Sequence, residues 1–366
     1  MGNQQLSIGN PTFHALTLLS IKNDCETLKA LVPIVKNPIY SLGLLQYMAL
    51  FCCATEEYCK STGQDVNFFA GSPFSISDIR CKLKLFDDRY GRTKNTISSI
   101  DDEQDEYFAS LLRFKWLSHF NIHYNLGIYI DRQDHMIGNT QYMHYMFQDK
   151  RFSNRNRMYK ENLKQLGYIL GSTINSFCEG LKDFGQPLNL SISPIKDPLF
   201  FNDYNTNRNF NVFPNHQDGK ELTLRLTHIL CALNFIGIAM KPVIPQTNLW
   251  YIRAKYITFY YAYRSVKTIN NKFPGMIVIP ESSKMESLLN SDFRSCMMHY
   301  SYINQGNELI ANDHLNLQSP FFGLIESCFS GMSFNDFISD LDHVIFTLSD
   351  IIEKQLNFDF SCKKPL

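Results

Sequence analysis

The stretch that decides the fold is residues 333–356, which read SFNDFISDLDHVIFTLSDIIEKQL. Ten of its apolar residues recur in steps of one, three or four, at positions 334, 337, 338, 341, 344, 345, 348, 351, 352 and 356. An α-helix turns once in about 3.6 residues, so these positions share one face. Ser333 and Asp336 have the spacing of a capping box at its start. The pattern predicts a long amphipathic helix that covers an apolar core.

Three further helices are predicted before it, at Glu221–Met240, Gln246–Asn270 and Glu281–Tyr302. The second of them is apolar or aromatic nearly all round over residues 249–263. Such a helix is buried on most sides or shared with another subunit. Four helices of this length can form a bundle. Residues 218–366 are therefore predicted to be a helical domain of a mainly α protein.

Residues 1–182 are predicted to form a second domain that is mostly helical, with an α+β fold as the alternative because residues 121–130 fit either a strand or a helix end. The acidic run at residues 101–106 suits the start of a helix, where the dipole favours negative charge. Residues 183–217 are rich in Pro, Asn, Asp and Gly, which predicts a linker or long loop. The expected N-terminal helices are Ile21–Leu31, Leu42–Tyr58, a short helix after Ser75, Tyr107–His119 and Asn156–Leu181.

The composition is that of a globular protein, with 44% hydrophobic residues, 19% charged residues and a formal net charge of zero. The chain as a whole has no excess of positive charge, so any contact with a nucleic acid must use a local patch of basic residues. The ten cysteines include no CxxC pair, which argues against a structural zinc site and for a reducing cytosol. The most apolar stretches, Leu44–Cys53 and Ile229–Met240, are too short to span a bilayer. We therefore expect a cytoplasmic protein with no signal peptide and no membrane partner.

Several enzyme classes lose support because their motifs do not occur. The sequence contains no GxxxxGK[ST], GxGxxG, GxSxG or HExxH pattern. Nucleotide triphosphate hydrolysis, dinucleotide chemistry and serine hydrolysis of the usual kinds are therefore not expected.

The third predicted C-terminal helix contains Asp292-Phe-Arg-Ser-Cys-Met-Met-His-Tyr300. Histidine titrates near neutrality and can accept or donate a proton, and arginine binds phosphate while it stays charged. RNA carries its own nucleophile, the 2′-hydroxyl. Arg294 and His299 can therefore hold a phosphate and transfer protons, with Ser295 as a further hydrogen-bond donor to phosphate.

Arg294, Ser295 and His299 resemble the R-x4–6-H signature of the HEPN superfamily, in a region of roughly residues 218–357. The resemblance implies a four- or five-helix bundle and a metal-independent endoribonuclease that needs no cofactor. It also implies a homodimer or higher oligomer, in which two motifs meet across a two-fold axis. Nucleases of this type commonly act as toxins or in defence against phage and are restrained by a protein partner. Arg294, His299 and Ser295 are then catalytic, and Tyr300 and Asp292 line or orient the site.

Helical geometry places Arg294 about 150° from the centre of the apolar face of its helix and His299 about 70° from it. The two side chains are about 140° apart around a regular helix, so their spacing alone does not bring them together. Two arrangements can bring Arg294 and His299 together. The helix loosens before His299, or a second subunit completes each site.

Other interpretations remain open. Arg294 can be a solvated surface residue and His299 a helix-capping residue, or the HEPN fold can be inactive. The chain can be a non-catalytic assembly protein that uses residues 249–263, or a nucleic-acid-binding subunit of a larger complex. The basic cluster for nucleic-acid contact is Arg151, Arg155, Arg157, Lys160 and Lys164. Weaker candidate sites are Arg113–His119 as a second motif, His119 with His123 as metal ligands, and Asp134, His135 and His144 as a loop site.

Overall fold

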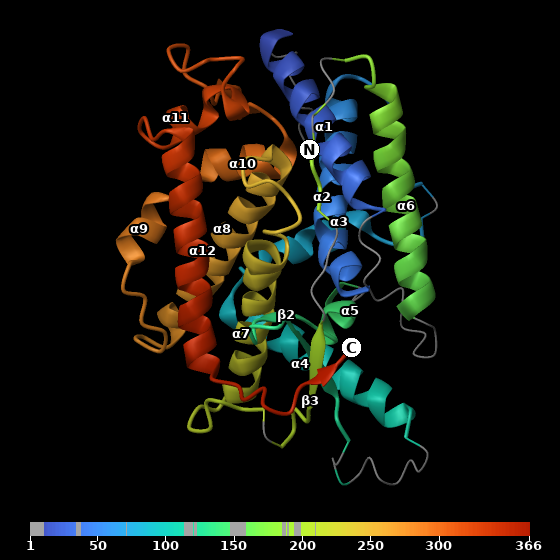
Figure 1. Cartoon of the computed structure of the whole chain (residues 1–366), viewed down its shortest axis with the longest axis vertical. Coiled ribbons are helices and arrows are strands. Elements are labelled where there is room, and N and C mark those ends of the chain that lie inside the picture. Colours follow the sequence, from blue (N-terminus) through green and yellow to red (C-terminus); the bar gives the residue numbers. More distant parts are fainter. Residues whose placement is uncertain are drawn as a thin grey trace.

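The computed structural model of the chain describes residues 11–33, 38–70, 72–112, 120, 123–146, 159–184, 188, 190–193, 199–208 and 210–366. The structure is 60% helix, with twelve α-helices and a small antiparallel sheet in this described part, which confirms a mainly α protein. Figure 1 shows the C-terminal helices side by side with the N-terminal ones and the sheet at the lower end of both. The first six helices are α1 (Pro11–Leu31), α2 (Pro38–Ser61), α3 (Ile76–Cys81), α4 (Tyr90–Ser110), α5 (Gln141–Met146) and α6 (Tyr159–Gly180). The last six are α7 (Gly219–Asn234), α8 (Leu249–Lys272), α9 (Ser282–Ser287), α10 (Ser291–His299), α11 (Leu324–Cys328) and α12 (Phe334–Leu356).

Helix α8 lies at the centre of the molecule. All of residues 250–263 are buried within this single chain, because α8 is packed against α1, α7, α10 and α12. The prediction that this helix is buried on most sides is confirmed. Its aromatic face is therefore not available to recruit a partner, which removes the basis for assembly through residues 249–263.

Helix α12 covers the core as its periodicity predicts. Phe337, Leu341, Val344 and Leu348 are buried against α7 and α8, and the opposite face is exposed. The Ser333 hydroxyl accepts a hydrogen bond from the backbone N–H of Asp336 and donates one to its carboxylate, which confirms the capping interaction.

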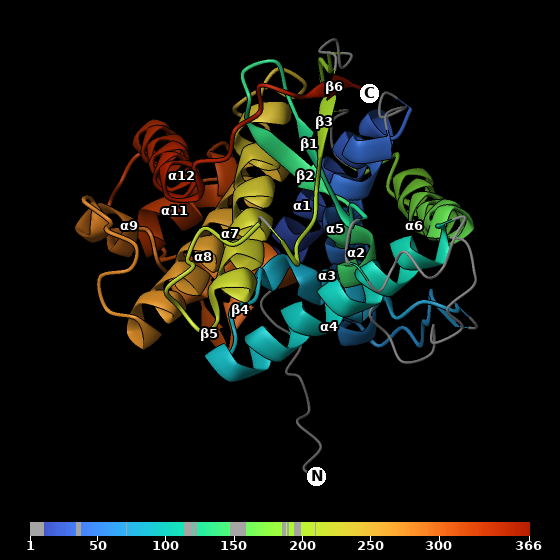
Figure 2. The ribbon, with the colours of Figure 1, turned by 90° about the horizontal axis from the view of Figure 1, so that it is seen from below.

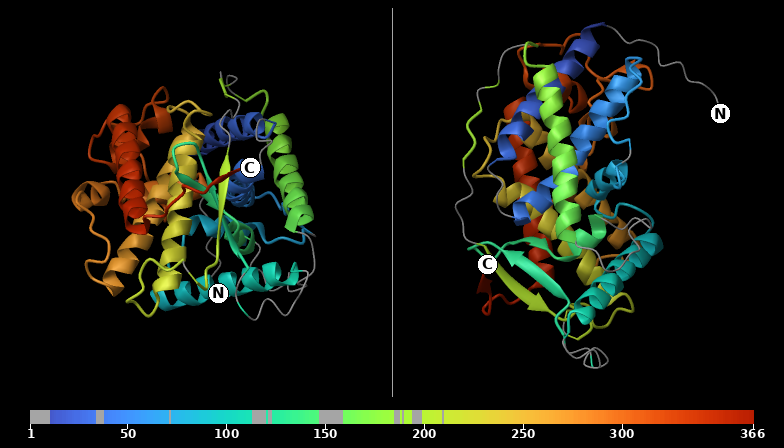
Figure 3. Two further views of the ribbon diagram at one scale, coloured as in Figure 1. Left: turned by 60° about the horizontal axis from the view of Figure 1, so that its bottom comes forward. Right: turned by 90° about the vertical axis from the view of Figure 1, so that its right-hand side faces the viewer.

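The sheet joins the two predicted domains. Its strands are β1 (Leu126–Ile130), β2 (Met136–Asn139), β3 (Phe200–Tyr204) and β6 (Lys364–Pro365), in the antiparallel order β2-β1-β3-β6. Strand β3 belongs to the predicted linker 183–217, yet it pairs with β1 on one side and with the C-terminal β6 on the other. One cluster of buried apolar side chains also runs from α1 to α12. The two halves therefore share a core, and Figure 3 shows the strands beside the ends of helices from both.

Two predicted helices differ from the observed ones. The acidic run 101–106 lies inside α4 and does not start a helix at Tyr107, and α4 ends at Ser110. Figure 2 shows α4 crossing the end of the molecule, where it contacts α5, α7 and α8. Buried Asp101 has partners there, since its carboxylate accepts hydrogen bonds from Gln141 and Lys220.

The predicted helix Glu281–Tyr302 is two helices. It breaks between α9 and α10, because the side chain of Asn290 caps α10 by accepting hydrogen bonds from the backbone N–H groups of Asp292 and Phe293. Helix α10 then ends where Tyr300 adopts a left-handed conformation with φ 57°.

The remaining elements are short. They comprise the 3-10 helices η1 (Lys82–Lys84) and η5 (Pro320–Gly323), the π-helix η4 (Phe235–Ala239), and the hairpin strands β4 (Ile303–Asn304) and β5 (Asn307–Glu308). Helix α7 continues directly into η4. The joint helix Gly219–Ala239 is long and apolar enough to cross a membrane, but 89% of its apolar window is buried inside the chain. Burial in the protein's own core accounts for this composition without a membrane.

A buried ion pair ties α10 to α1 and α8. The Arg253 guanidinium donates to Asp24 at 2.7 Å, and both side chains are 1% exposed. The Tyr300 hydroxyl donates to the same carboxylate oxygen, and the guanidinium lies 3.8 Å from the centre of the Tyr300 ring. Arg253 also donates to the backbone carbonyls of Cys296 and Met297, at 3.2 and 3.1 Å. Helix C-termini leave carbonyls without intrahelical partners, and Arg253 supplies a donor there to the carbonyl of Met297, while that of Cys296 also accepts the backbone N–H of Tyr300.

We predict that Asp24→Ala lowers the free energy of unfolding by about 3–5 kcal/mol, because it leaves the buried Arg253 charge without its counter-ion. Urea denaturation measures the change. The matched control is Glu179→Ala, which breaks the exposed Lys29–Glu179 pair of equal length, 2.7 Å, and should cost less than about 1 kcal/mol. An equal loss of unfolding free energy in the two variants would show that the buried Arg253–Asp24 pair matters no more to the fold than an exposed pair.

Candidate active site

His299 ends α10 and contacts the N-terminal half of the chain. Its Nδ1 lies 2.8 Å from the Oε2 of Glu57 in α2, and the two side chains are 40% and 42% exposed. A carboxylate at Nδ1 favours the tautomer that carries its proton there and leaves the Nε2 lone pair free. Nε2 makes no hydrogen bond to the residues that the structure describes. A histidine oriented in this way is equipped to exchange protons with a molecule at the surface.

Arg80 in α3 completes the cluster. Its Nη1 donates to the other carboxylate oxygen of Glu57 at 2.6 Å, and its side chain is only 14% exposed. Partial burial acts to raise the pKa of Glu57, but the hydrogen bond from His299 and the charge of Arg80 outweigh burial and lower it. Glu57 is therefore ionised at neutral pH, and its two carboxylate oxygens face His299 and Arg80. We call Glu57, Arg80 and His299 the histidine cluster.

The structure does not bring Arg294 to His299. The Arg294 guanidinium lies 5.8 Å from the ring centre of Tyr260 in α8, and its Nε is buried without a hydrogen-bond partner in the described residues. His299 instead faces Glu57 in α2. Helix α10 is regular up to His299, so the helix does not loosen before it. A loosened helix therefore does not unite the pair within this chain.

The other predicted residues of this motif have separate surroundings. Ser295 is half-buried beside Arg294. Asp292 is exposed and accepts a hydrogen bond from Asn304, at 2.8 Å. The side chain of Tyr300 is 1% exposed and bonded to Asp24, so it anchors the helix in the core and does not line a surface that RNA could reach.

The predicted basic cluster cannot be placed as a whole. Arg151, Arg155 and Arg157 lie outside the described residues, and Lys160 lies in the first turn of α6 with its side chain outside them. Lys164 is exposed on α6.

The structure describes only some of the residues of the weaker candidate sites. Arg113 and His119 lie outside the described residues, and His123 is buried 3.0 Å from Asp105. His135 pairs with Asp131, whereas His144 is buried and its pKa is lowered to about 4 by that burial. Over the described ranges no group of three or more His, Cys, Asp or Glu is placed to hold a metal ion.

Glu57 and Arg80 are the residues of the cluster that the sequence did not reveal. Glu57 is 242 residues away from His299 in the chain. The neighbouring Glu56 pairs with Lys60 one helical turn further on, as many helical glutamates do. Nothing in the sequence therefore marks Glu57, and not Glu56, as the residue that contacts a distant histidine.

Comparison with family models, curated proteins and solved structures finds no match to this chain.

We predict that His299→Ala raises the pKa of Glu57, because it removes the hydrogen bond that helps to lower it. Carbon-13 NMR of the glutamate carboxylates measures this. The matched control is His343→Ala, because His343 and Glu281 form a similar pair at 2.7 Å with both side chains 43% exposed. A lowered pKa in the folded state stabilises the protein above the pKa of the unfolded chain, and this stability is lost as pH falls through the folded value. An unchanged Glu57 pKa in His299→Ala would show that the pair does not form in solution.

Proposed function

We propose that this protein is a metal-independent endoribonuclease in which His299, oriented by Glu57, transfers the protons. The observation that carries the proposal is the 2.8 Å contact between His299 Nδ1 and Glu57, which leaves Nε2 free at a partly exposed position. The assignment of RNA as substrate rests on the resemblance of Arg294, Ser295 and His299 to the HEPN signature.

The reaction needs few groups. His299 Nε2 takes the proton of a ribose 2′-hydroxyl while that oxygen forms a bond to the adjacent phosphorus. The bond from phosphorus to the 5′-oxygen breaks, and this oxygen takes a proton from water or from the histidine of a second subunit. The products are a 2′,3′-cyclic phosphate and a 5′-hydroxyl. Glu57 holds the imidazole in the required tautomer and orientation, as the carboxylate does in other carboxylate–histidine pairs.

Charge on the phosphate requires a cation close to the scissile bond. Arg80 forms an ion pair with Glu57, the same carboxylate that contacts His299. Arg294 of the same chain faces Tyr260 in α8. We infer that Arg294 acts in a homodimer or higher oligomer, on the site of the neighbouring copy, with Ser295 beside it. A cytoplasmic toxin or antiviral effector, restrained by a regulatory protein, is the biological role that fits this activity.

A second candidate function is RNA binding without cleavage, as an inactive HEPN-like subunit of a larger complex. This candidate is favoured because Glu57, Arg80 and His299 join three helices, α2, α3 and α10. An ion network can do this for stability alone, without any catalysis.

We predict that the purified protein cleaves total RNA in EDTA to fragments with cyclic phosphate ends. His299→Ala should lower the rate by at least about 100-fold, since proton transfer contributes this much or more. Glu57→Gln should lower it less, and the matched control His343→Ala should leave it unchanged. Mass spectrometry of the fragment ends measures product and rate.

Arg294→Ala and His299→Ala should each be inactive alone, and mixing them tests whether a second copy completes the site. If Arg294 acts in trans, a mixture of Arg294→Ala and His299→Ala regains activity, because one of the two sites in a mixed dimer is intact.

RNA that binds to the wild-type protein but is never cleaved would favour the second candidate function and contradict the first.

A further inference from the structure

Two cysteines meet where α1 packs against α6. Cys25 on α1 is not exposed, and Cys178 on α6 is 7% exposed. The Lys29–Glu179 ion pair, 2.7 Å long, joins the same two helices, with Lys29 one turn after Cys25 and Glu179 directly after Cys178. The right-hand view of Figure 3 shows α6 alongside the N-terminal helices. The fold therefore places two thiols, far apart in the sequence, at one contact between helices.

The two thiol groups are in hydrogen-bonding contact, and this contact has the largest effect on the pKa of each. It raises the pKa of Cys25, and burial and the charges of Glu26 and Asp24 raise it further. It lowers the pKa of Cys178, and the charge of Lys29 adds to this, although burial and nearby carboxylates oppose it. Cys178 is therefore the thiol that loses its proton more readily, and Cys25 is the protonated partner.

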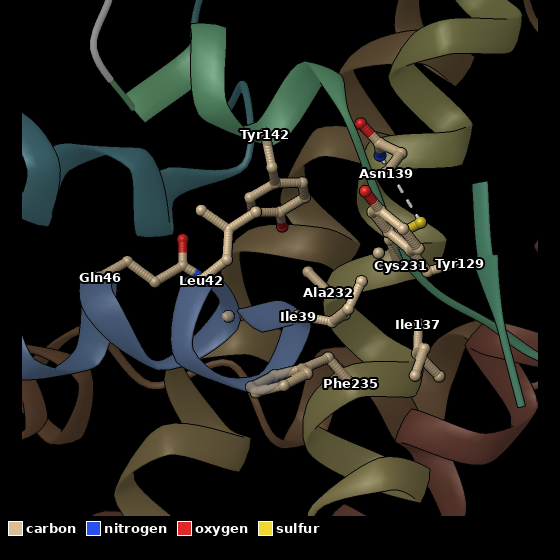
Figure 4. A pocket seen from close by; sticks show the side chains of 12 residues that line it. Ile39, Leu42, Gln46, Tyr129, Ile137, Asn139, Tyr142, Cys231, Ala232 and Phe235 are labelled. Carbon is tan, nitrogen blue, oxygen red and sulfur yellow. Dashed lines mark hydrogen bonds between the residues drawn. The ribbon is translucent and has the colours of Figure 1, made fainter. Parts of the chain in front are cut away.

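Cys231 is a buried cysteine in different surroundings. Figure 4 shows it in the wall of a small pocket, where its Sγ accepts a hydrogen bond from Asn139 at 3.6 Å. The described residues that line this pocket include no second cysteine. Burial raises the pKa of the Cys231 thiol to about 12, so this thiol stays protonated. Cys231 is therefore an internal control for the reactivity of the Cys25–Cys178 pair.

The arrangement of the pair suits oxidation by a small molecule. The thiolate is the form of cysteine that reacts, and redox-sensitive cysteines often lie beside a second, resolving cysteine. Cys178 has the lowered pKa and the small exposed area, whereas Cys25 is enclosed. Because so little of Cys178 is exposed, the oxidant has to be small. An oxidised Cys178 sulfur is already in contact with the Cys25 thiol that can resolve it.

We propose that Cys25 and Cys178 form a reversible redox site, in which hydrogen peroxide or a similarly small hydroperoxide converts the two thiols to a disulfide. The Cys178 thiolate attacks one peroxide oxygen, the O–O bond breaks, and a sulfenic acid forms. The other oxygen leaves as hydroxide or alkoxide and takes a proton from solvent. The Cys25 sulfur then bonds to the Cys178 sulfur, the S–O bond breaks, and the hydroxyl group leaves with the Cys25 proton as water. The two sulfurs lose two electrons, which the peroxide gains, and a thiol reductant reverses the reaction by exchange.

The disulfide ties α6 covalently to α1. Without it, the Lys29–Glu179 pair between these helices is exposed and contributes little. Asp24, which precedes Cys25, is the partner of Arg253 and so helps to hold the end of α10. The redox site thus lies beside the buried ion pair of the core, and it does not depend on the proposed ribonuclease activity.

The test maps the thiols of the full-length protein after mild oxidation. Reduced protein is treated with an equimolar amount of hydrogen peroxide, the free thiols are blocked with N-ethylmaleimide in urea, and the peptides are identified by mass spectrometry. We expect a linked Cys25–Cys178 peptide that dithiothreitol separates, and oxidation of this pair at least about tenfold faster than that of Cys231. Cys25→Ser should stop at a sulfenic acid on Cys178, which dimedone traps. Cys178→Ser should leave Cys25 reduced.

The mapping of the wild-type protein needs no variant, so the proposal can fail even if a serine variant does not fold, which circular dichroism shows. Absence of the linked peptide, or its formation only when peroxide is added in urea, would overturn the proposal, because the two thiols would then not meet in the folded chain. Oxidation of Cys231 as fast as that of the pair would overturn it too. In a folded Cys178→Ser variant, oxidation of Cys25 at the wild-type rate would contradict the assigned order of the two steps.

Discussion

The buried Arg253–Asp24 pair, with Tyr300 on both groups, is the interaction on which the geometry of the molecule depends. A buried ion pair gains little net stability, because desolvation offsets the attraction between its charges. Its contribution here is to fix the positions of three helices relative to one another. Arg253 comes from the central helix α8, Asp24 from α1, and the carbonyls that Arg253 binds belong to the last turn of α10. The end of α10 is thereby fixed in place, and His299 is the residue at that end.

The histidine cluster follows from this constraint. With α10 held on α1 and α8, His299 can reach only what the neighbouring helices present, and that is Glu57 on α2, supported by Arg80 on α3. The N-terminal half therefore supplies the groups that orient the histidine of a C-terminal motif. The shared core and the strand pairs of β3 make this arrangement part of one folded unit.

Local patterns predicted the long helices well, because a repeated apolar face reflects burial directly. Helix α12 with its Ser333 cap and the buried α8 are the clearest cases. What depends on distant partners could not be predicted. Strand β3 lies in a segment rich in loop residues and exists because β1 and β6 pair with it. The break before α10 had a local signal in Asn290, a good N-cap residue, but the apolar period continued across it. Glu57 and Arg80 had no signal, because their role is set by a contact 242 residues along the chain.

The most direct test of the account observes the imidazole of His299 while RNA is bound. The measurement is ¹⁵N NMR of histidine-labelled protein with an RNA oligonucleotide whose 2′-hydroxyls are replaced by fluorine, so that it can bind but not react. The Nε2 resonance of His299 should shift on binding, Nδ1 should keep its hydrogen bond to Glu57, and the His343 resonances should stay unchanged. An unchanged His299 spectrum at saturating oligonucleotide would contradict the claim that this histidine meets the RNA backbone.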